Sequence, residues 1–557
     1  MAGLATSYGS GAMSNSMDDV AEKAATLFII GSNTTEQHPV FGTMLRQAVL
    51  QRGAKLVVAD PRRIEITELA QPHYGGLHLQ HKPGTDVALI NGLMYIILEK
   101  GWEDRAFIEE RTEGFEECEK IVKQYPPEIT AEITGIPVEQ LYQAAEILAT
   151  NKPMAVIWAM GITQHIVGVR NVMDLANLQM LLGNIGKPGG GVNPLRGQNN
   201  VQGACDMGGL PNGYPGYQAV TIEEVRKKFE AAWGATSSLK IGMTVTEMIP
   251  AIAEGKVRAL YILGEDPVMS DPDTAHIRHC LESCDFILLQ EIFPSETSPY
   301  ADILLPGVSF TEKTGTVTNT ERRVQMVRQA ITPLGEARPD WQITAELARR
   351  ILAIGERKVS PAPQASWEYT DTDQIMKEIG LLTPSYAGVS HARLENGERL
   401  QWPVRNLEHA GTPILHTAQF ARGRGKFTGI EHIPPAEMPD DEYPMVLSTG
   451  RVLYHWHGGE MTRRAQGLAE IYDRAYIEVN PEDAERLDLN GHHRVRLQSR
   501  RGVIEAEAWI TDRVPPGMVF ANFHFPEASA NELTIAALDP VAKIPEYKVC
   551  AVRVQKV

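Results

Sequence analysis

The feature that most constrains the fold of this chain is a strand-and-turn unit that occurs twice. An apolar run, a glycine and then a polar residue two places later appear in residues 28–33 and again in residues 261–266. Each unit leads through a helical segment into a second apolar strand, at residues 55–60 and 286–290, that ends in polar residues. Strand, helix and strand in this order imply a parallel sheet, so the sequence predicts two doubly wound α/β domains.

Open parallel sheets bind ligands beyond the carboxyl ends of their strands, and two such units therefore suggest two nucleotide-like sites. Neither unit has the G-x-G-x-x-G turn of a dinucleotide fold, which argues against direct NAD binding. Asp60 follows a strand as a ribose-binding acid would, although acids at strand ends are also common. Two domains with ordinary turns are the alternative at this point.

The C-terminal part of the chain has a different pattern. From Tyr443 onward, short predicted strands at residues 443–448, 475–479, 493–497, 503–509 and 518–520 alternate apolar and polar residues. They are separated by turns such as residues 489–491 and 499–502, which is typical of a closed β-barrel. The sequence therefore predicts an α/β domain over 1–198, an α/β domain over 199–352, a Pro-rich connector over 353–435 and a β-barrel domain over 436–557.

Composition excludes several classes of function. The chain has 53 Lys+Arg against 70 Asp+Glu, a formal net charge of −17, so a nucleic-acid-binding body is not expected. Five cysteines among 557 residues form no disulfide framework and favour a reducing, cytoplasmic compartment. No apolar run reaches membrane-spanning length, and the first residues lack a basic and then apolar signal, so membrane insertion is not expected.

A polar loop at residues 189–208 carries much of the chemistry. It is rich in glycine, asparagine and glutamine around the single Arg196, and it has neither helical nor strand periodicity. Glycines let a backbone approach a ligand closely, amides supply donors and acceptors, and a guanidinium matches a carboxylate bidentately. The loop predicts a pocket for a small anion. The alternative is an ordered connecting loop whose amides satisfy its own backbone.

A second concentration of cations and imidazoles occupies residues 451–464. His455 and His457 lie two apart, so in an extended chain both would face one side, as metal ligands can. No third ligand is evident nearby, and Arg451 with the histidines favours phosphate or pyrophosphate binding instead. A solvated surface loop is the remaining alternative.

The loop at residues 192–208, Val-Asn-Pro-Leu-Arg-Gly-Gln-Asn-Asn-Val-Gln-Gly-Ala-Cys-Asp-Met-Gly, resembles the substrate loop of molybdenum- or tungsten-dependent formate dehydrogenase catalytic subunits. Those subunits belong to the dimethyl sulfoxide reductase family, and the likeness extends from Ala2 to Lys548. The resemblance implies reversible two-electron oxidation of formate to carbon dioxide at a Mo or W centre held by bis-molybdopterin guanine dinucleotide. It also implies one dinucleotide per α/β unit and an electron-transfer subunit or iron–sulfur protein as partner.

By match of motif, the resemblance assigns Arg196 as the catalytic residue that holds and orients the formate carboxylate. Gln198 is expected to help seat the pterin beside it. The first dinucleotide arm would be lined by Gly31, Asn33, Asp60, Pro61, Arg62, Gly84 and Asp86, with Met160 and Gln164 close to the pterins. The second arm would be lined by Gly264, Asp266 and Gln290, and the barrel would contribute Arg451, His455, His457, Asn531 and Lys548.

The sequence departs from the family pattern at its beginning. Family members carry a cysteine-ligated 4Fe-4S domain and then a metal-ligating cysteine or selenocysteine directly before a histidine, and neither motif is present. The resemblance places this metal ligand before Met1, so no metal ligand is predicted within the chain, and Cys205 is not a substitute by motif position.

We interpret the chain as read from downstream of an in-frame selenocysteine codon, with Met1 as an alternative start. The 4Fe-4S cluster is then expected only in a full-length form, and formate oxidation by this chain alone is not expected. The alternatives are another substrate in the same family, such as nitrate, or a non-catalytic cofactor-binding fragment.

Overall fold

The computed structural model of this protein describes residues 1–354 and 367–557 and divides into two compact units. Unit 1 consists of residues 1–195, 267–278 and 414–557, and unit 2 consists of the described residues of 196–266 and 279–413. The part of the predicted connector at residues 355–366 lies outside the described residues. The predicted domain boundaries stay predictions.

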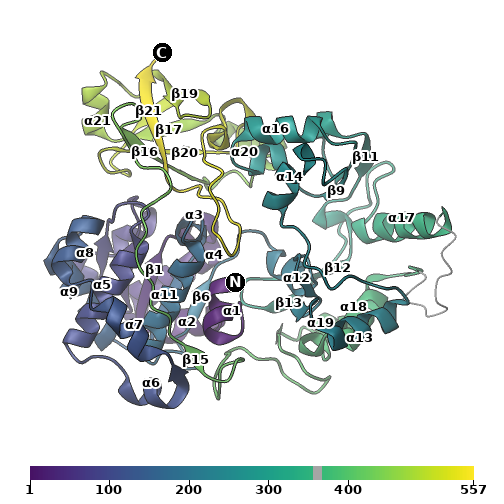
Figure 1. Cartoon of the computed structure of the whole chain (residues 1–557), viewed down its shortest axis with the longest axis horizontal. Helices are drawn as coiled ribbons and strands as arrows, with labels where there is room; N and C mark the ends of the chain where they lie inside the picture. Colours follow the sequence, from purple (N-terminus) through teal and green to yellow (C-terminus); the bar gives the residue numbers. More distant parts are fainter. Residues whose placement is uncertain (355–366) are drawn as a thin grey trace. The chain divides into compact units, whose positions relative to one another are not determined.

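Unit 1 contains a five-stranded parallel sheet with the order β3-β2-β1-β5-β6, of which β1 and β6 are labelled in Figure 1. Its strands are β1 (Thr26–Ile30), β2 (Lys55–Ala59), β3 (Leu77–Leu79), β5 (Met154–Trp158) and β6 (Val192–Pro194). The strands pair in parallel throughout, so all five carboxyl ends lie along one edge of the sheet.

These strands are apolar at successive positions because both faces of the sheet are covered. Phe28 and Ile30 of β1 belong to a core shared with α5 (Asp86–Glu99), α9 (Val138–Thr150) and α11 (Gly168–Leu181). Leu27 and Ile29 point into a separate core with α2 (Met17–Lys23) and α4 (Pro39–Arg52). The alternation confirms the predicted α/β class for this part of the chain.

The turn after β1 requires its glycine for two reasons. Gly31 has φ +57°, a conformation that side chains rarely adopt. A Cβ atom at this position would lie 2.5 Å from the backbone nitrogen of Ile162. The close approach is fixed by a hydrogen bond from the Gly161 amide, in α10 (Met160–Thr163), to the Gly31 carbonyl at 3.0 Å. The chain therefore passes close to the carboxyl edge of the sheet at this point.

In unit 2, β9 (Ala259–Leu263), β10 (Phe286–Glu291) and β11 (Ile303–Pro306) form a smaller parallel sheet with the order β11-β10-β9. The turn after β9 has the second glycine of the repeated unit, Gly264, with φ +62°, but a Cβ atom there would meet nothing within 4 Å. The two glycines thus share a backbone conformation and differ in their surroundings.

This difference predicts unequal costs for the same substitution. Gly264→Ala meets only the conformational penalty, about 1 kcal/mol, whereas Gly31→Ala adds a steric clash with backbone and is expected to cost about 3 kcal/mol. Urea unfolding followed by circular dichroism measures both. Equal losses of stability in the two variants would contradict this account of the first turn.

Residues 372–401, within the predicted connector, contain regular structure. They form α18 (Thr372–Leu382), α19 (His391–Glu395) and β14 (Leu400–Gln401), and β14 pairs with β13 (Arg323–Val327), which also pairs with β12 (Gly315–Thr318). Strand β14 thus pairs with a strand far away in the sequence, which a local pattern does not reveal.

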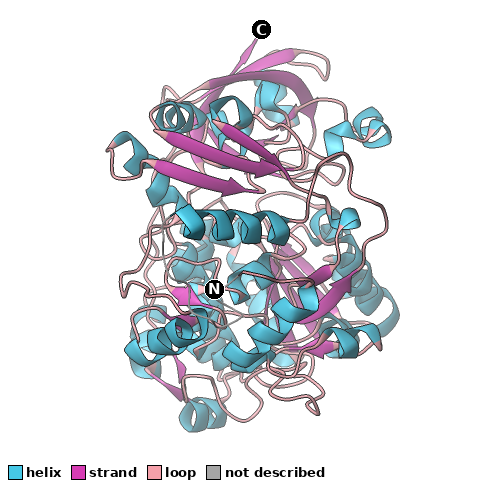
Figure 2. Ribbon diagram, turned by 90° about the vertical axis from the view of Figure 1, so that its right-hand side faces the viewer, coloured by secondary structure: helices cyan, strands magenta, loops and turns pink. Residues whose placement is uncertain are grey.

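The C-terminal part of unit 1 is a closed barrel, which confirms the prediction for this region. Its order is β16-β20-β17-β19-β18-β21. The strands are β16 (Met445–Gly450), β17 (Tyr476–Val479), β18 (Arg494–Gln498), β19 (Val503–Ile510), β20 (Met518–Asn522) and β21 (Cys550–Lys556). The last of them, which runs to the C-terminal label in Figure 2, was not recognised in the sequence.

Among the described residues, no helix has the length and apolar character needed to cross a membrane.

Candidate functional site

The turn after β1 and the start of α3 (Thr34–Gln37) hold a group of buried polar atoms that lack hydrogen-bond partners among the described residues. They are the hydroxyl of Ser32, both amide atoms of Asn33 and the hydroxyls of Thr34 and Thr35. A buried polar atom left without a partner costs about 1–3 kcal/mol, so native proteins rarely tolerate several at one place. The atoms follow the carboxyl end of a central strand, where open α/β sheets bind ligands. This turn therefore fits a polar ligand.

Arg62, in the loop after β2, is held by the barrel. Its Nη2 lies 2.6 Å from Oε1 of Glu478 on β17, and its Nε donates to Oε2 of Glu478 at 3.2 Å. The guanidinium carbon lies 3.5 Å from the ring centroid of Phe520 on β20. Arg62 and Glu478 are both buried, and removing one partner of such a pair typically costs about 3–5 kcal/mol. The barrel thereby fixes a cation beside the sheet.

Asp60 and Pro61 shape the start of the same loop. The Asp60 carboxylate accepts a hydrogen bond from the Arg62 amide at 2.9 Å, and the Pro61 carbonyl accepts one from the side chain of Gln80 at 3.0 Å. Burial raises the pKa of Asp60. The structure thus brings the three predicted residues of this loop together.

A second group of basic side chains is buried in unit 1. Lys548 donates a hydrogen bond to the carbonyl of Thr449, and Nη2 of Arg451 lies 3.0 Å from Nε2 of His457. Burial and the charge of Arg451 lower the pKa of Lys548 to about 7. Burial lowers the pKa of Arg451 to about 10, and burial with the charge of Arg451 lowers that of His457 to about 3.

These lowered pKa values show that the charged forms of the basic side chains in this cluster are disfavoured. The negative charge of Asp60 favours the protonated form of Lys548, whereas the positive charges of Arg451 and Arg62 disfavour it. A bound anion would offset the repulsion and the desolvation together. The donor set, guanidinium and ammonium groups at the carboxyl edge of a parallel sheet, suits the phosphates of a nucleotide.

Lys548→Met is expected to flatten the pH dependence of stability. Lysine in an unfolded chain keeps its proton up to about pH 10, whereas the folded pKa is about 7. Between these values the unfolded state binds the extra proton, so the free energy of unfolding falls by a few kcal/mol as the pH is lowered from about 10 to about 7. Below about pH 7 this group has no further effect.

Urea unfolding at several pH values measures this contribution. The unchanged protein should lose stability from about pH 10 to about pH 7 relative to Lys548→Met. Lys556→Met, which removes a half-exposed lysine paired with Asp488, should follow the unchanged protein. Parallel curves for the unchanged protein and Lys548→Met would contradict the assignment.

His455 and His457 do not share a face. His455 has Nε2 at 2.6 Å from the Tyr472 carbonyl and Nδ1 at 3.2 Å from the Thr462 hydroxyl, so its ring is held by the scaffold. His457 has φ +48°, which breaks the extended conformation that the sequence argument assumed. The condition under which both rings would face one side, an extended chain, is therefore not met, and the two imidazoles have separate partners.

Other predicted residues of the first arm lie at the ends of elements. Asp86 begins α5 and lies 3.2 Å from Nε2 of His81, and Gly84, with φ +80°, forms the turn before it. Met160 begins α10 and Gln164 follows its last residue. Asn531 lies elsewhere in unit 1, where its Nδ2 donates to the carbonyl of Met269 at 2.7 Å.

The first residue of the chain takes part in a helix. Met1 is the N-cap of α1 (Ala2–Tyr8), and its carbonyl accepts a hydrogen bond from the Ala5 amide at 2.9 Å. Within residues 1–354 and 367–557, no group of three or more His, Cys, Asp or Glu side chains is arranged to hold a metal ion. The expectation that the family's cysteine or selenocysteine ligand precedes Met1 stays a prediction, because a residue before Met1 lies outside the structure.

The predicted second arm, in unit 2, is already hydrogen-bonded within the protein. Asp266 accepts from the Glu296 amide at 3.1 Å and the Thr297 hydroxyl at 2.6 Å. Gln290 donates to Asp340 at 2.8 Å and accepts from the hydroxyl of Tyr261. Gly264 forms the adjacent turn. These polar groups are near one another in the fold but, unlike those after β1, they have protein partners.

Arg196 lies in unit 2, two residues after the end of β6, and its side chain is supported by a hydrogen-bond network. Its Nε donates to Oε1 of Gln202 at 3.3 Å, and its backbone amide donates to the Thr320 hydroxyl at 3.0 Å. Gln202 in turn donates to Asp206 at 2.8 Å. Gln202 and Asp206 are four residues apart on α12 (Val201–Asp206), which places them on one helix face. Gln198, in the same loop, is exposed.

The far end of this network is a buried carboxylate. Asp206 accepts from the hydroxyl of Tyr217 at 2.7 Å and that of Tyr386 at 2.6 Å. Burial raises the pKa of Asp206 even though the tyrosines and Gln202 favour its charged form. Burial and the negative charge of Asp206 raise the pKa of both tyrosines, so they remain protonated donors. The network leaves Gln202 little freedom to rotate.

Residues 3–350 match the molybdopterin oxidoreductase family, and residues 445–551 match the molydopterin dinucleotide binding domain. The chain belongs to the molybdopterin oxidoreductase family. Both matched stretches include cationic residues described above: Arg62 and Arg196 in the first, Arg451 and Lys548 in the second.

Relatives of known name agree with this family. F420-dependent formate dehydrogenase subunit alpha of Methanocaldococcus jannaschii is 44% identical over all of this chain and 80% of that protein. Formate dehydrogenase H of Escherichia coli is 38% identical over all of this chain and 76% of that protein. Among solved structures, acetylene hydratase from Pelobacter acetylenicus has a TM-score of 0.75 at 18% identity and covers the whole chain and 80% of that chain, which supports the fold.

Several residues of these sites were missed in the sequence. Glu478 could have been noticed as an acid in the otherwise apolar run of residues 476–479. Gln202 and Asp206 could have been paired by their spacing of four within the loop motif. Phe520 and Tyr386 carry no local signal, because they are brought to their partners only by the fold.

Proposed function

We propose that this molybdopterin oxidoreductase carries the substrate-binding and dinucleotide-binding parts of a formate dehydrogenase. The observation that carries the proposal is Arg196, a guanidinium supported through Gln202 by a buried carboxylate, in a loop that resembles the family's substrate loop. The identity of 38–44% to proteins named formate dehydrogenase supports it.

The chain's own residues supply what a bis-molybdopterin guanine dinucleotide requires. Arg62, Arg451 and Lys548 would meet its phosphates, and the polar atoms of Ser32 and Asn33 would meet polar groups of the first arm. Gly264, Asp266 and Gln290 would serve the second arm. When bound, the molybdenum or tungsten form of this group supplies the two-electron redox chemistry.

Arg196 would bind the formate carboxylate and hold it in one orientation. A guanidinium offers two parallel N–H donors to a carboxylate, and its charge compensates the anion when water is excluded. Lysine cannot provide this planar fork. Asp206 would act as a positioning residue, because it fixes Gln202 and so the direction of the Arg196 side chain.

The proposal includes two further expectations. The electrons would pass to an electron-transfer subunit or iron–sulfur protein, because formate oxidation releases two electrons that this chain's residues do not store. The sparse cysteines, of which Cys118, Cys280 and Cys550 are buried, suit a reducing, cytoplasmic compartment.

Substitution of Arg196 tests the proposal. In the cofactor-loaded full-length form, assayed by formate-dependent dye reduction, Arg196→Ala is expected to lower kcat/KM by about 100-fold or more, and Arg196→Lys by about 10-fold. Asp206→Asn is expected to raise KM for formate several-fold with a smaller change in kcat, because it alters the orientation of a group that binds substrate.

Arg258→Gln is the matched control, since Arg258 is an exposed arginine of unit 2 paired with Asp285. It should leave kcat/KM unchanged. Turnover of formate by Arg196→Ala within a few-fold of the unchanged enzyme would contradict the proposal, as would a preference for nitrate over formate that depends on Arg196.

A further inference from the structure

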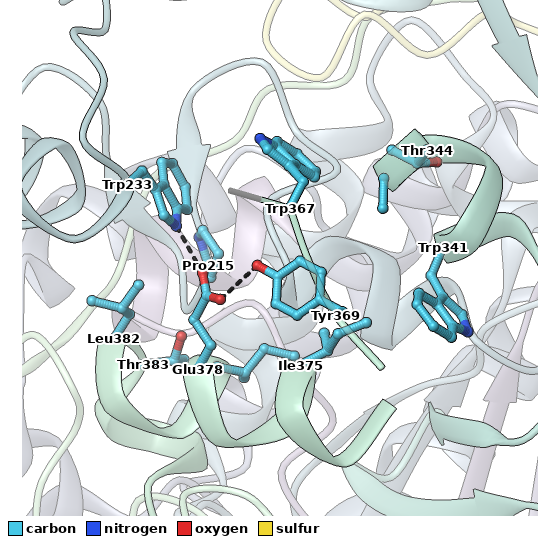
Figure 3. Close-up of a pocket in the computed structure, with 12 residues that line it drawn as sticks. Pro215, Trp233, Trp341, Thr344, Trp367, Tyr369, Ile375, Glu378, Leu382 and Thr383 are labelled. Carbon is cyan, nitrogen blue, oxygen red and sulfur yellow. Dashed lines mark hydrogen bonds between the residues drawn. The ribbon is translucent and has the colours of Figure 1, made fainter. Parts of the chain in front are cut away.

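Unit 2 contains an aromatic cavity that lies outside the residues assigned above to formate and cofactor. Its volume is about 260 Å³. Three tryptophans and a tyrosine line it, Trp233, Trp341, Trp367 and Tyr369, together with apolar side chains that include Ile375 and Leu382 (Figure 3). Tryptophan is uncommon, and so many large rings at one partly open cavity are unusual for a surface that only faces water.

The rings come from separate elements. Trp233 ends α13 (Glu223–Trp233), and Trp341 is the second residue of α17 (Asp340–Ile354). Trp367 and Tyr369 precede α18, which supplies Glu378. The cavity is therefore a product of the tertiary fold of this unit.

A carboxylate lies among these rings. Oε1 of Glu378 accepts a hydrogen bond from Nε1 of Trp233 at 3.0 Å, and Oε2 accepts one from the Tyr369 hydroxyl at 2.6 Å. Figure 3 shows the carboxylate between these two side chains, with Trp367 nearby. Burial, the hydrogen bond and the charge of Glu378 raise the pKa of Tyr369, so the phenol remains a donor. The carboxylate is thus held in one orientation.

The charge of Glu378 has no cationic partner within residues 1–354 and 367–557: no lysine, arginine or histidine there forms an ion pair with it. The faces of tryptophan and tyrosine rings carry negative potential and attract cations. A carboxylate and several aromatic faces around one space therefore favour a positive ligand.

The type of cation follows from hydrogen-bonding capacity. A primary ammonium has three donors, and the side chains that line the cavity are rings and aliphatic groups apart from Glu378 and the hydroxyls of Thr344 and Thr383, so acceptors are few. Both oxygens of Glu378 already accept a hydrogen bond. A quaternary ammonium has no donors, and aromatic walls are its usual protein environment.

We propose that this cavity binds a small quaternary ammonium ion. The volume, comparable to roughly nine water molecules in the liquid, suits a trimethylammonium head with a short chain. Such binding is independent of the proposed formate chemistry and needs neither Arg196 nor the dinucleotide.

The test uses choline as probe and dimethylbutanol, in which carbon replaces the ammonium nitrogen, as the neutral isostere. Saturation-transfer NMR on the methyl protons, titrated with the whole chain, gives the affinity of each. Choline is expected to bind about tenfold or more tightly than the isostere. Glu378→Gln, which keeps an acceptor for Trp233 but removes the charge, should weaken choline binding about tenfold.

Glu346→Gln is the matched control, because Glu346 lies on α17 and pairs with Arg349 and Arg350 but does not line the cavity. It should bind choline as the unchanged protein does. Trp367→Leu, at an exposed position that should tolerate substitution, is expected to weaken choline binding several-fold and provides a second variant. The proposal would be overturned by equal affinity for the two probes or by the absence of choline binding up to about 50 mM. Unchanged choline binding by Glu378→Gln or Trp367→Leu would also overturn it.

Discussion

The proposed dinucleotide site at the carboxyl edge of the unit 1 sheet depends on the buried ion pair between Arg62 and Glu478. It joins the loop at the carboxyl edge of the parallel sheet to a strand of the barrel, so two regions 416 residues apart in sequence meet at one charge pair. Phe520 covers the guanidinium from the barrel side. Because a buried charge without its partner is costly, the pair favours one arrangement of loop and barrel over alternatives.

Around this pair the polar groups fall into two kinds. Arg62 and Asp60 form hydrogen bonds with protein atoms. By contrast, the polar side chains after β1 have no partner among the described residues, and burial disfavours the charged forms of Lys548 and Arg451. The first kind is held rigidly by the protein, and in the proposal Arg62 meets a phosphate from this fixed position. The second kind is what a nucleotide ligand would satisfy. The second arm differs, since Asp266 and Gln290 already bond to neighbouring residues.

The sequence predicted those features that depend on local pattern. Apolar runs followed by glycine identified β1 and β9, and alternation identified five of the six barrel strands. The sixth, β21, was missed because its alternation is confined to the last residues of the chain. The partners of Arg196 could be predicted only in part: Gln202 and Asp206 share a helix face, but Tyr386 lies 180 residues from Asp206 and reaches it through the fold. The extended geometry assumed for His455 and His457 failed because a turn, invisible in the residue pattern, intervenes.

We propose that the buried basic cluster and the polar turn after β1 hold one of two pterin guanine dinucleotides. The guanine nucleotide released by mild acid hydrolysis from protein purified out of cells that make this cofactor tests it most directly. We expect two guanine nucleotides per folded chain, and fewer when Lys548 and Arg451 are replaced together. Folded protein from the same cells that releases no guanine nucleotide would contradict it.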